Sequence, residues 1–131
     1  MKFLLGLQRT YNSELTKESS VYPRICGKGN YHYEIIEINV EQNGSYTFDS
    51  NNTIELYGYI YNNDFDPSYP NKNLITQSSF SCGRYYFQLG SYFEINKIYI
   101  LVVTTFEPNI RGSFTLFIIG PNNMTLNRIS K

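Results

Sequence analysis

Side chains that carry oxygen ligands gather around one turn-rich stretch of the sequence. Asp64 and Asp66 lie within residues 62–73, a segment that holds two prolines, and Asp49 ends an earlier predicted strand. Calcium prefers carboxylate and amide oxygens, so these three aspartates are the candidate ligands. Asn and Asp also start turns without any ion, and Asp66-Pro67 has that form. We expect no metal and no other cofactor, with calcium at these residues as the alternative.

Aromatic residues and a single histidine are the other side chains that could recognise or transform a small molecule. Tyr57, Tyr59 and Tyr61 share one face of a predicted strand, where they would either stack against a sugar or pack between layers. His32 is the one histidine. The Gly-x-Ser-x-Gly motif of a serine nucleophile is absent. We therefore expect no enzymatic activity, and we favour packing for the tyrosines.

Two covalent features are typical of a secreted chain. Cys26 and Cys82 are either two buried thiols or one disulfide, and their neighbouring glycines favour the disulfide, which implies an oxidising, extracellular setting. Asn43, Asn51 and Asn123 each begin an Asn-x-Ser/Thr sequon within a predicted turn. These three asparagines are the predicted N-glycosylation sites.

Strands of period two must position these residues. Residues 31–40 alternate with one phase slip, which a β-bulge near Ile35-Ile36 would explain. Asn43-Gly44 then predicts a hairpin to a return strand at residues 45–49. Residues 98–106 are apolar on both faces, as in a central strand. With turn signals about every ten residues, the chain is predicted to be all-β: an antiparallel β-sandwich of the jelly-roll type with seven to nine strands. The predicted core includes five residues: Phe48, Leu101, Val103, Phe114 and Leu116.

Composition narrows the class of partner. The chain has 131 residues, 41% of them hydrophobic, and its 11 basic residues balance 11 acidic ones. A zero net charge argues against binding nucleic acid through its phosphates. No apolar run approaches the roughly 18 residues of a membrane span. One histidine and two cysteines exclude a His-cluster metal site and a multi-cysteine zinc module.

Three blocks together resemble a known family. They are YHYEIIEINV (31–40), TIELYGYIYNNDFDPSYPNKNLI (53–75) and IYILVVTTFEPNIRGSFTLFIIGP (98–121). They resemble a repeat domain of large secreted eukaryotic surface proteins, related to the bacterial pre-peptidase C-terminal β-sandwich. The resemblance implies an extracellular accessory domain of sandwich fold. The family has an acidic run where residues 78–83 carry no carboxylate here, and its Asp before the YGY motif corresponds to Glu55, so the resemblance does not extend to a cation site.

The apolar N-terminus suggests how copies of the chain associate. Residues 1–20 are predicted to form a strand or tail, and residues 21–131 the sandwich. Four apolar side chains in the tail are the predicted assembly residues: Phe3, Leu4, Leu5 and Leu7. The tail docks either on a neighbouring copy, forming a head-to-tail homopolymer, or on its own domain. The sequence thus predicts a structural subunit of an extracellular filament or surface coat, assembled by exchange of strand edges. The alternative is a carbohydrate- or ligand-binding accessory module of a larger secreted protein.

Overall fold

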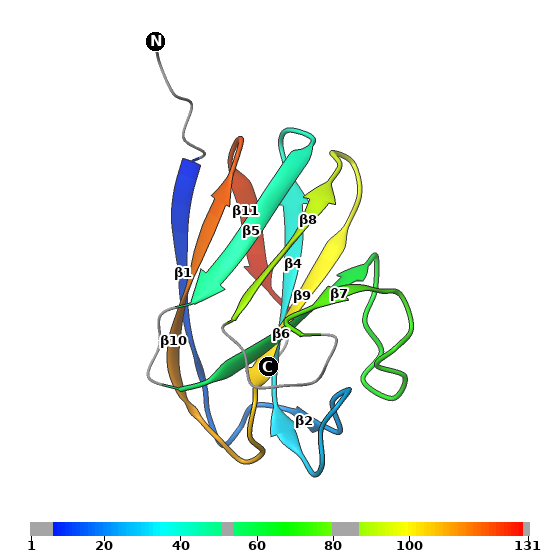
Figure 1. Cartoon of the computed structure of the whole chain (residues 1–131), viewed down its shortest axis with the longest axis vertical. Coiled ribbons are helices and arrows are strands. Elements are labelled where there is room, and N and C mark those ends of the chain that lie inside the picture. The colour runs from blue at the N-terminus through cyan, green and yellow to red at the C-terminus, as the bar shows by residue number, and fades with distance from the viewer. Residues whose placement is uncertain (1–6, 51–53, 80–86, 130–131) are drawn as a thin grey trace.

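Two antiparallel sheets stacked face to face make up the molecule (Figure 1). The computed structural model describes residues 7–50, 54–79 and 87–129. The all-β sandwich is confirmed, and the eleven strands of the described residues exceed the predicted seven to nine because two strands have only two residues each. The strands are β1 (Leu7–Leu15), β2 (Val21–Tyr22), β3 (Tyr31–His32), β4 (Glu34–Val40), β5 (Gly44–Ser50), β6 (Leu56–Asn62), β7 (Leu74–Gln77), β8 (Gln88–Phe93), β9 (Tyr99–Thr105), β10 (Gly112–Gly120) and β11 (Met124–Arg128).

The pairings that join the most distant parts of the chain lie at one edge of each sheet, β1 with β10 and β11 with β4. The four-stranded sheet has the order β1-β10-β5-β8, and the five-stranded sheet has the order β11-β4-β9-β6-β7. The strand predicted to be central, β9, is the middle strand of the five-stranded sheet, and all of its residues are buried. β2 and β3 form a separate small ribbon.

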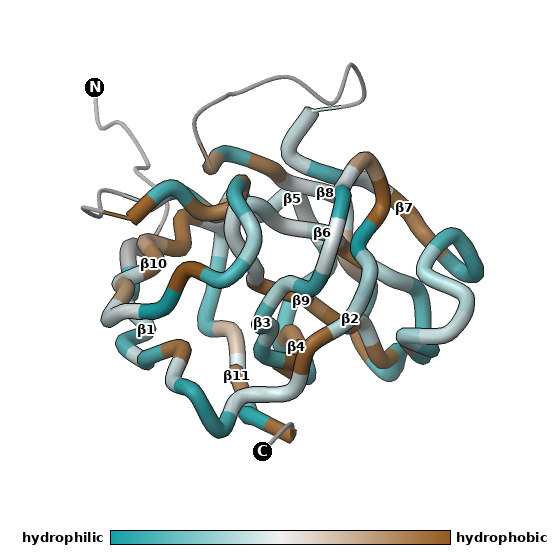
Figure 2. Tube along the Cα trace, turned by 90° about the horizontal axis from the view of Figure 1, so that it is seen from below, coloured by the Kyte–Doolittle hydropathy of each residue, from teal (hydrophilic) through white to brown (hydrophobic). Residues whose placement is uncertain are grey.

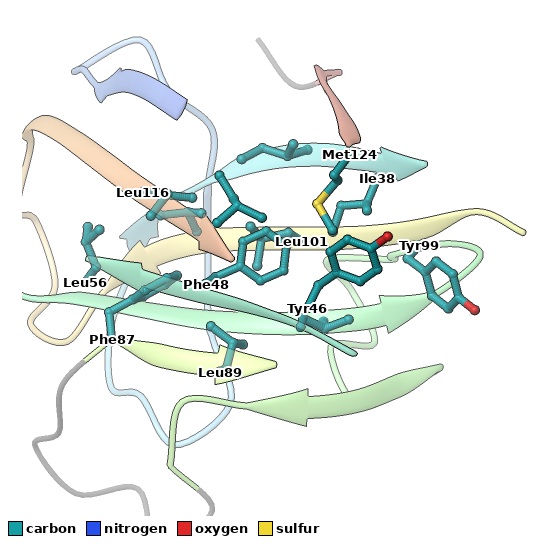
Figure 3. Close-up of a cluster of buried hydrophobic side chains, with 14 of the residues drawn as sticks. Ile38, Tyr46, Phe48, Leu56, Phe87, Leu89, Tyr99, Leu101, Leu116 and Met124 are labelled. Carbon is teal, nitrogen blue, oxygen red and sulfur yellow. The ribbon is translucent and has the colours of Figure 1, made fainter. Parts of the chain in front are cut away.

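The main core lies between the two sheets, and its predicted members are confirmed. Five predicted side chains are each at most 2% exposed: Phe48, Leu101, Val103, Phe114 and Leu116. Figure 3 shows Phe48, Leu101 and Leu116 converging on the same space from different strands. Their burial from both sheets is the main source of stability, because apolar area removed from water stabilises by about 25 cal/mol per Å².

A second apolar cluster covers the outer face of the five-stranded sheet. It contains eight buried residues: Tyr22, Tyr33, Tyr57, Tyr59, Tyr61, Phe65, Ile100 and Val102. The segment carrying β2 and β3 lies over this face, and Figure 2 shows both short strands beside β9. The sheet is therefore buried on both sides, although a sandwich sheet usually has one wet face.

This second cluster corrects the predicted β-bulge near Ile35-Ile36. The even-numbered residues Ile36 and Ile38 face the main core, while Tyr33 and Ile35 pack in the second cluster. The pairing of β4 with β9 runs without a register shift. The apparent phase slip arises because both faces of the strand are covered.

The hairpin predicted at Asn43-Gly44 is also wrong. β4 pairs with β11 and β9, whereas β5 pairs with β10 and β8, so the turn connects the two sheets instead of two neighbouring strands. Crossing between sheets lets Ile38 of β4 and Tyr46 of β5 enter one core from opposite sides. A hairpin would place the strands edge to edge in one sheet.

Residues 7–15 pair within the sandwich of their own chain. β1 pairs with β10 over nine consecutive positions, from Leu7 opposite Gly120 to Leu15 opposite Gly112. Residues 7–15 are thus a strand of the domain that was predicted to begin at residue 21. The predicted assembly residues Phe3, Leu4 and Leu5 lie outside the described residues.

Candidate functional site

The two sheets leave a groove between their edge strands β1 and β11. These strands lie on the same side of the sandwich, and among the described residues each pairs with one neighbour only (Figure 1). The groove has a volume of about 240 Å³ and six lining residues: Arg9, Thr10, Tyr11, Met124, Thr125 and Leu126. We call this region, from β1 across to β11, the seam.

A buried carboxylate organises the seam. Glu34 at the start of β4 is 1% exposed and points between the sheets. Its oxygens accept hydrogen bonds from the Tyr11 hydroxyl and from Ser13 Oγ at 2.5 Å, both on β1. Arg128 of β11 approaches the same carboxylate, with Nε 3.4 Å from Oε1. One side chain of the five-stranded sheet thereby holds the edge strand of the other sheet.

The protonation state of Tyr11 suits a structural role. Burial raises the pKa of its hydroxyl well above the ordinary 10.0, and the hydrogen bond to Glu34 raises it further. The hydroxyl therefore stays protonated and donates to the carboxylate at physiological pH. A phenol held in this way is a hydrogen-bond donor and a poor candidate for a base or nucleophile.

The open end of the seam is polar. Arg9 of β1 donates through Nη1 to the backbone carbonyl of Met124 at 3.3 Å and to Asn123 Oδ1 at 3.5 Å. Arg9 is exposed, so these long hydrogen bonds are exchangeable with water. At this end the two sheets are joined by solvated polar contacts instead of interlocked apolar side chains.

The seam was not predicted from the sequence, although two signals for it were present. Glu34 stands at an inward position of a strand whose other inward residues are apolar. In β1, the inward residues Tyr11 and Ser13 alternate with outward polar residues. Because the inward side chains also carry hydroxyls, the alternation does not stand out as an amphipathic pattern. The partners are 21 and 23 residues apart in the chain, so the pairing itself required the fold.

The three calcium candidates are not brought together. Asp49 lies on β5 in the four-stranded sheet, whereas Asp64 and Asp66 follow β6 of the opposite sheet. Asp64 Oδ1 accepts the Phe65 amide at 2.8 Å, and Asp66 Oδ1 accepts the Ser68 amide at 2.9 Å. Within residues 7–50, 54–79 and 87–129, no three metal-ligating side chains cluster. The two loop aspartates thus act as turn formers.

The tyrosine ladder is buried and cannot be a sugar-stacking surface. Tyr57, Tyr59 and Tyr61 are each at most 1% exposed. Their hydroxyls donate to backbone carbonyls of covering segments: Tyr59 to Ile25 and Tyr61 to Pro70, both at 2.7 Å, and Tyr57 to Ser79. The ladder fastens loops onto the five-stranded sheet.

The single histidine is likewise engaged in structure. His32 is half-buried, and its Nδ1 lies 2.9 Å from the backbone carbonyl of Ser19. Its own carbonyl accepts the Thr104 hydroxyl at 2.6 Å. These contacts join β3 to the segment before β2 and to β9.

The predicted disulfide and glycosylation sites lie partly within the described residues. Cys26 is exposed in the connection between β2 and β3, with a positive φ of 68°, and Cys82 lies outside the described residues, so their disulfide stays a prediction. Asn43 and Asn123 are exposed in two neighbouring turns, which are joined by a hydrogen bond from Asn122 Nδ2 to Gln42 Oε1 at 3.2 Å. The third sequon, at Asn51, also lies outside the described residues.

Comparisons with known proteins leave the family open. No protein-family model matches the chain. A search of curated proteins finds no significant relative. The resemblance to the surface-protein repeat stays a prediction from the three sequence blocks. In the described part of the chain, no helix has the length and apolarity to cross a membrane.

Proposed function

We propose that this protein is a structural subunit of an extracellular filament or surface coat, and that copies assemble by exchanging strand edges. The observation that carries the proposal is β1, a nine-residue edge strand whose pairing with β10 has no register shift. Proteins that avoid edge-to-edge association shorten, bulge or twist such strands. β7, an edge of the other sheet, has only four residues and a register shift at Ile60/Tyr61.

The engagement of the reactive side chains supports a structural role. Glu34 and Tyr11 are held in hydrogen bonds that join strands, and the His32 ring is held against the Ser19 carbonyl in the segment before β2. The resemblance to secreted surface proteins, the predicted disulfide and the exposed sequons at Asn43 and Asn123 favour an extracellular, glycosylated homopolymer. The apolar tail residues Phe3, Leu4 and Leu5 remain the predicted assembly residues, together with Leu7 at the start of β1.

The test is the oligomeric state of the purified full chain. Negative-stain images and sedimentation velocity should show filaments or long head-to-tail oligomers whose length grows with protein concentration. Replacing Phe3, Leu4 and Leu5 together by Ser should shorten them, whereas replacing the exposed Lys72 of a distant loop should not. Monodisperse monomers across the concentration range would refute the proposal.

A second candidate function rests on the outer face of the four-stranded sheet. Alternation along β10 and β8 points Phe117, Ile119 and Tyr92 outward, and Ile119 and Tyr92 are 40% and 58% exposed. Hydroxyl-bearing Thr47 lies opposite Ile119. An aromatic and aliphatic surface with hydroxyls suits a carbohydrate or another small ligand. Glycan-array binding that disappears in Tyr92→Ala would favour this accessory module over the filament subunit.

A further inference from the structure

We infer that β1 is the strand that moves between copies: in the assembly, β1 of one copy lies beside β10 of the next. This inference rests on the proposed function and identifies its exchanged element. The place beside β10 is thus taken by residues 7–15 of a second copy of the same chain. Such an exchange reproduces the contacts that β1 makes with its own sandwich, so it requires no new kind of interface.

The backbone pairing of β1 allows it to separate from the sandwich. β1 is the N-terminal described strand and the edge of its sheet, and within the described part of the chain it pairs only with β10. By contrast, β10 pairs with both β1 and β5, and β5 pairs with both β10 and β8. Withdrawing β1 therefore breaks one ladder and leaves the other strand pairings of the sandwich in place.

The side chains of β1 add few apolar contacts. Leu15 at its end is 1% exposed and belongs to the main core, and Tyr11 is only partly buried against it. The inward residues between and before them, Ser13 and Arg9, make polar contacts. Removing an interior strand such as β9 would instead expose a fully buried run. The apolar surface uncovered by opening is correspondingly small.

The vacated site is selective for a second β1. When β1 leaves, the buried Glu34 carboxylate loses the donors Tyr11 and Ser13 and keeps Arg128. A strand that covers the carboxylate again without supplying donors would leave a buried charge with missing partners, which is strongly disfavoured. The incoming strand must therefore present two inward hydroxyls two residues apart. β1 of another copy satisfies this requirement, and a generic edge strand does not.

A short connection provides the hinge. Residues 16–20 join β1 to β2, and they fold into a tight turn in which Ser19 N donates to Thr16 O at 3.0 Å and Thr16 N donates to Ser19 Oγ at 2.9 Å. The turn directs β1 back along its own domain. If the turn opens, β1 extends to a neighbour, and a head-to-tail contact whose rotation does not close builds a filament.

The test uses one residue on each side of the β1–β10 ladder. Asn12 and Thr115 are opposite each other, and the Thr115 hydroxyl donates to Asn12 Oδ1 at 2.6 Å. Protein carrying Asn12→Cys is mixed with protein carrying Thr115→Cys, assembled, and treated with oxidant or a short thiol cross-linker. A denaturing, non-reducing gel then shows whether the two different copies are joined. The wild-type chain, with its own Cys26 and Cys82, is the blank.

Exchange predicts a covalent dimer of the two variants that is at least ten-fold more abundant than in either variant alone. Pairing Asn12→Cys with Thr47→Cys, which lies two strands away on β5, is the matched control and should give none. Glu14→Cys with Ser113→Cys repeats the test at a second exposed pair in the same ladder.

Each outcome decides a different point. Filaments that form without the mixed bridge at either pair would overturn exchange of β1 and leave the proposed function standing. Mixed bridges in closed dimers would support β1 exchange and contradict a filament. Samples that stay monomeric and unbridged would overturn both.

Discussion

The second apolar cluster depends on a buried arginine, and this dependence gives the strongest prediction. Arg24 is 4% exposed beneath the loops that cover the five-stranded sheet. Its guanidinium donates to three backbone carbonyls: Nε to Thr105 at 3.1 Å, Nη1 to Ile25 at 2.7 Å and Nη2 to Phe106 at 2.7 Å. Nη1 also donates to the Tyr59 hydroxyl at 3.3 Å. The perturbation is Arg24→Met, which keeps the length and apolar stem and removes every donor.

Aromatic rings add to the loss. The guanidinium carbon lies 4.6 Å from the ring centre of Tyr31 and 4.4 Å from that of Tyr57. A desolvated cation–π contact contributes up to about 2 kcal/mol. A hydrogen bond to a charged group contributes about 1.5–3 kcal/mol. The recovered cost of burying a charge offsets part of these contributions. The carbonyls of Thr105 and Phe106 lose their guanidinium donors, which costs about 1–3 kcal/mol each.

We therefore expect Arg24→Met to lower the free energy of unfolding by about 4 kcal/mol. With a urea dependence of about 2 kcal/mol per molar, the unfolding midpoint should fall by roughly 2 M. Arg24→Lys should lose somewhat less, because an ammonium keeps the charge but cannot donate along the directions of the guanidinium fork. Far-UV circular dichroism during urea titration measures both variants.

The matched control is Arg9→Met, because Arg9 is exposed and its hydrogen bonds are 3.3 and 3.5 Å long. We expect this change to cost less than about 0.5 kcal/mol. If the free energies of unfolding of Arg24→Met and Arg9→Met differ by less than about 1 kcal/mol, the carbonyl and ring contacts of Arg24 do not hold the covering loops, and the prediction is refuted.

Three further predictions concern the alkaline limit, the packing of a turn and the calcium question. Burial raises the pKa of Tyr22, Tyr59 and Tyr61 above the ordinary 10.0. Below pH 10 these three hydroxyls stay protonated in the folded and the unfolded chain, so the free energy of unfolding keeps its full value. Above pH 10 it should fall by about 1.4 kcal/mol per hydroxyl for each pH unit, about 4 kcal/mol for the three at pH 11. Tyrosinate absorbance that appears while circular dichroism stays native would contradict this. Gly120→Ala should cost about 1–3 kcal/mol in urea titration, because an added Cβ would lie 2.0 Å from the buried Tyr46 ring; an unchanged midpoint would show that the ring moves freely. Calcium should leave the melting temperature unchanged, and a rise that saturates with calcium concentration would reveal a site.

Local pattern predicted the class of fold and much of the core. Alternation and turn signals identified β10 and β5, and an uninterrupted apolar run identified β9 as central. Phe48 followed from its parity within β5, and Leu101 followed from the apolar run of β9. Burial of side chains is decided largely within a strand, so a sequence window contains most of the relevant information.

The choice of strand partners is a long-range property, and there the pattern was insufficient. Asn43-Gly44 provides a tight turn whether the following strand pairs with the preceding one or crosses to the other sheet. The chain crosses to the other sheet after β4 because Ile38 and Tyr46 then fill one core from two sides. Likewise, the covering cluster on the outer face of β4 made an ordinary strand resemble a bulged one.

The seam and Arg24 were missed for the same reason. A charged residue at an inward position is expected to be buried only if partners satisfy it. Those partners are distant in sequence: Glu34 meets Tyr11 and Ser13 from an earlier strand, and Arg24 meets the carbonyl of Thr105, 81 residues further along. Sequence shows the charge, and only the fold supplies the partners.

The two layers of the sandwich differ in how firmly their parts are held, and this difference supports the proposed exchange of β1. The five-stranded sheet is packed on both faces, with Arg24 and the tyrosine hydroxyls fastening its cover. The four-stranded sheet is packed on one face, and its edge strand β1 is held by one ladder and a polar network around Glu34. Polar contacts are exchanged with water more readily than apolar ones are uncovered. A strand held in this way can separate while the main core stays packed, and the site that it leaves accepts only a strand that satisfies Glu34.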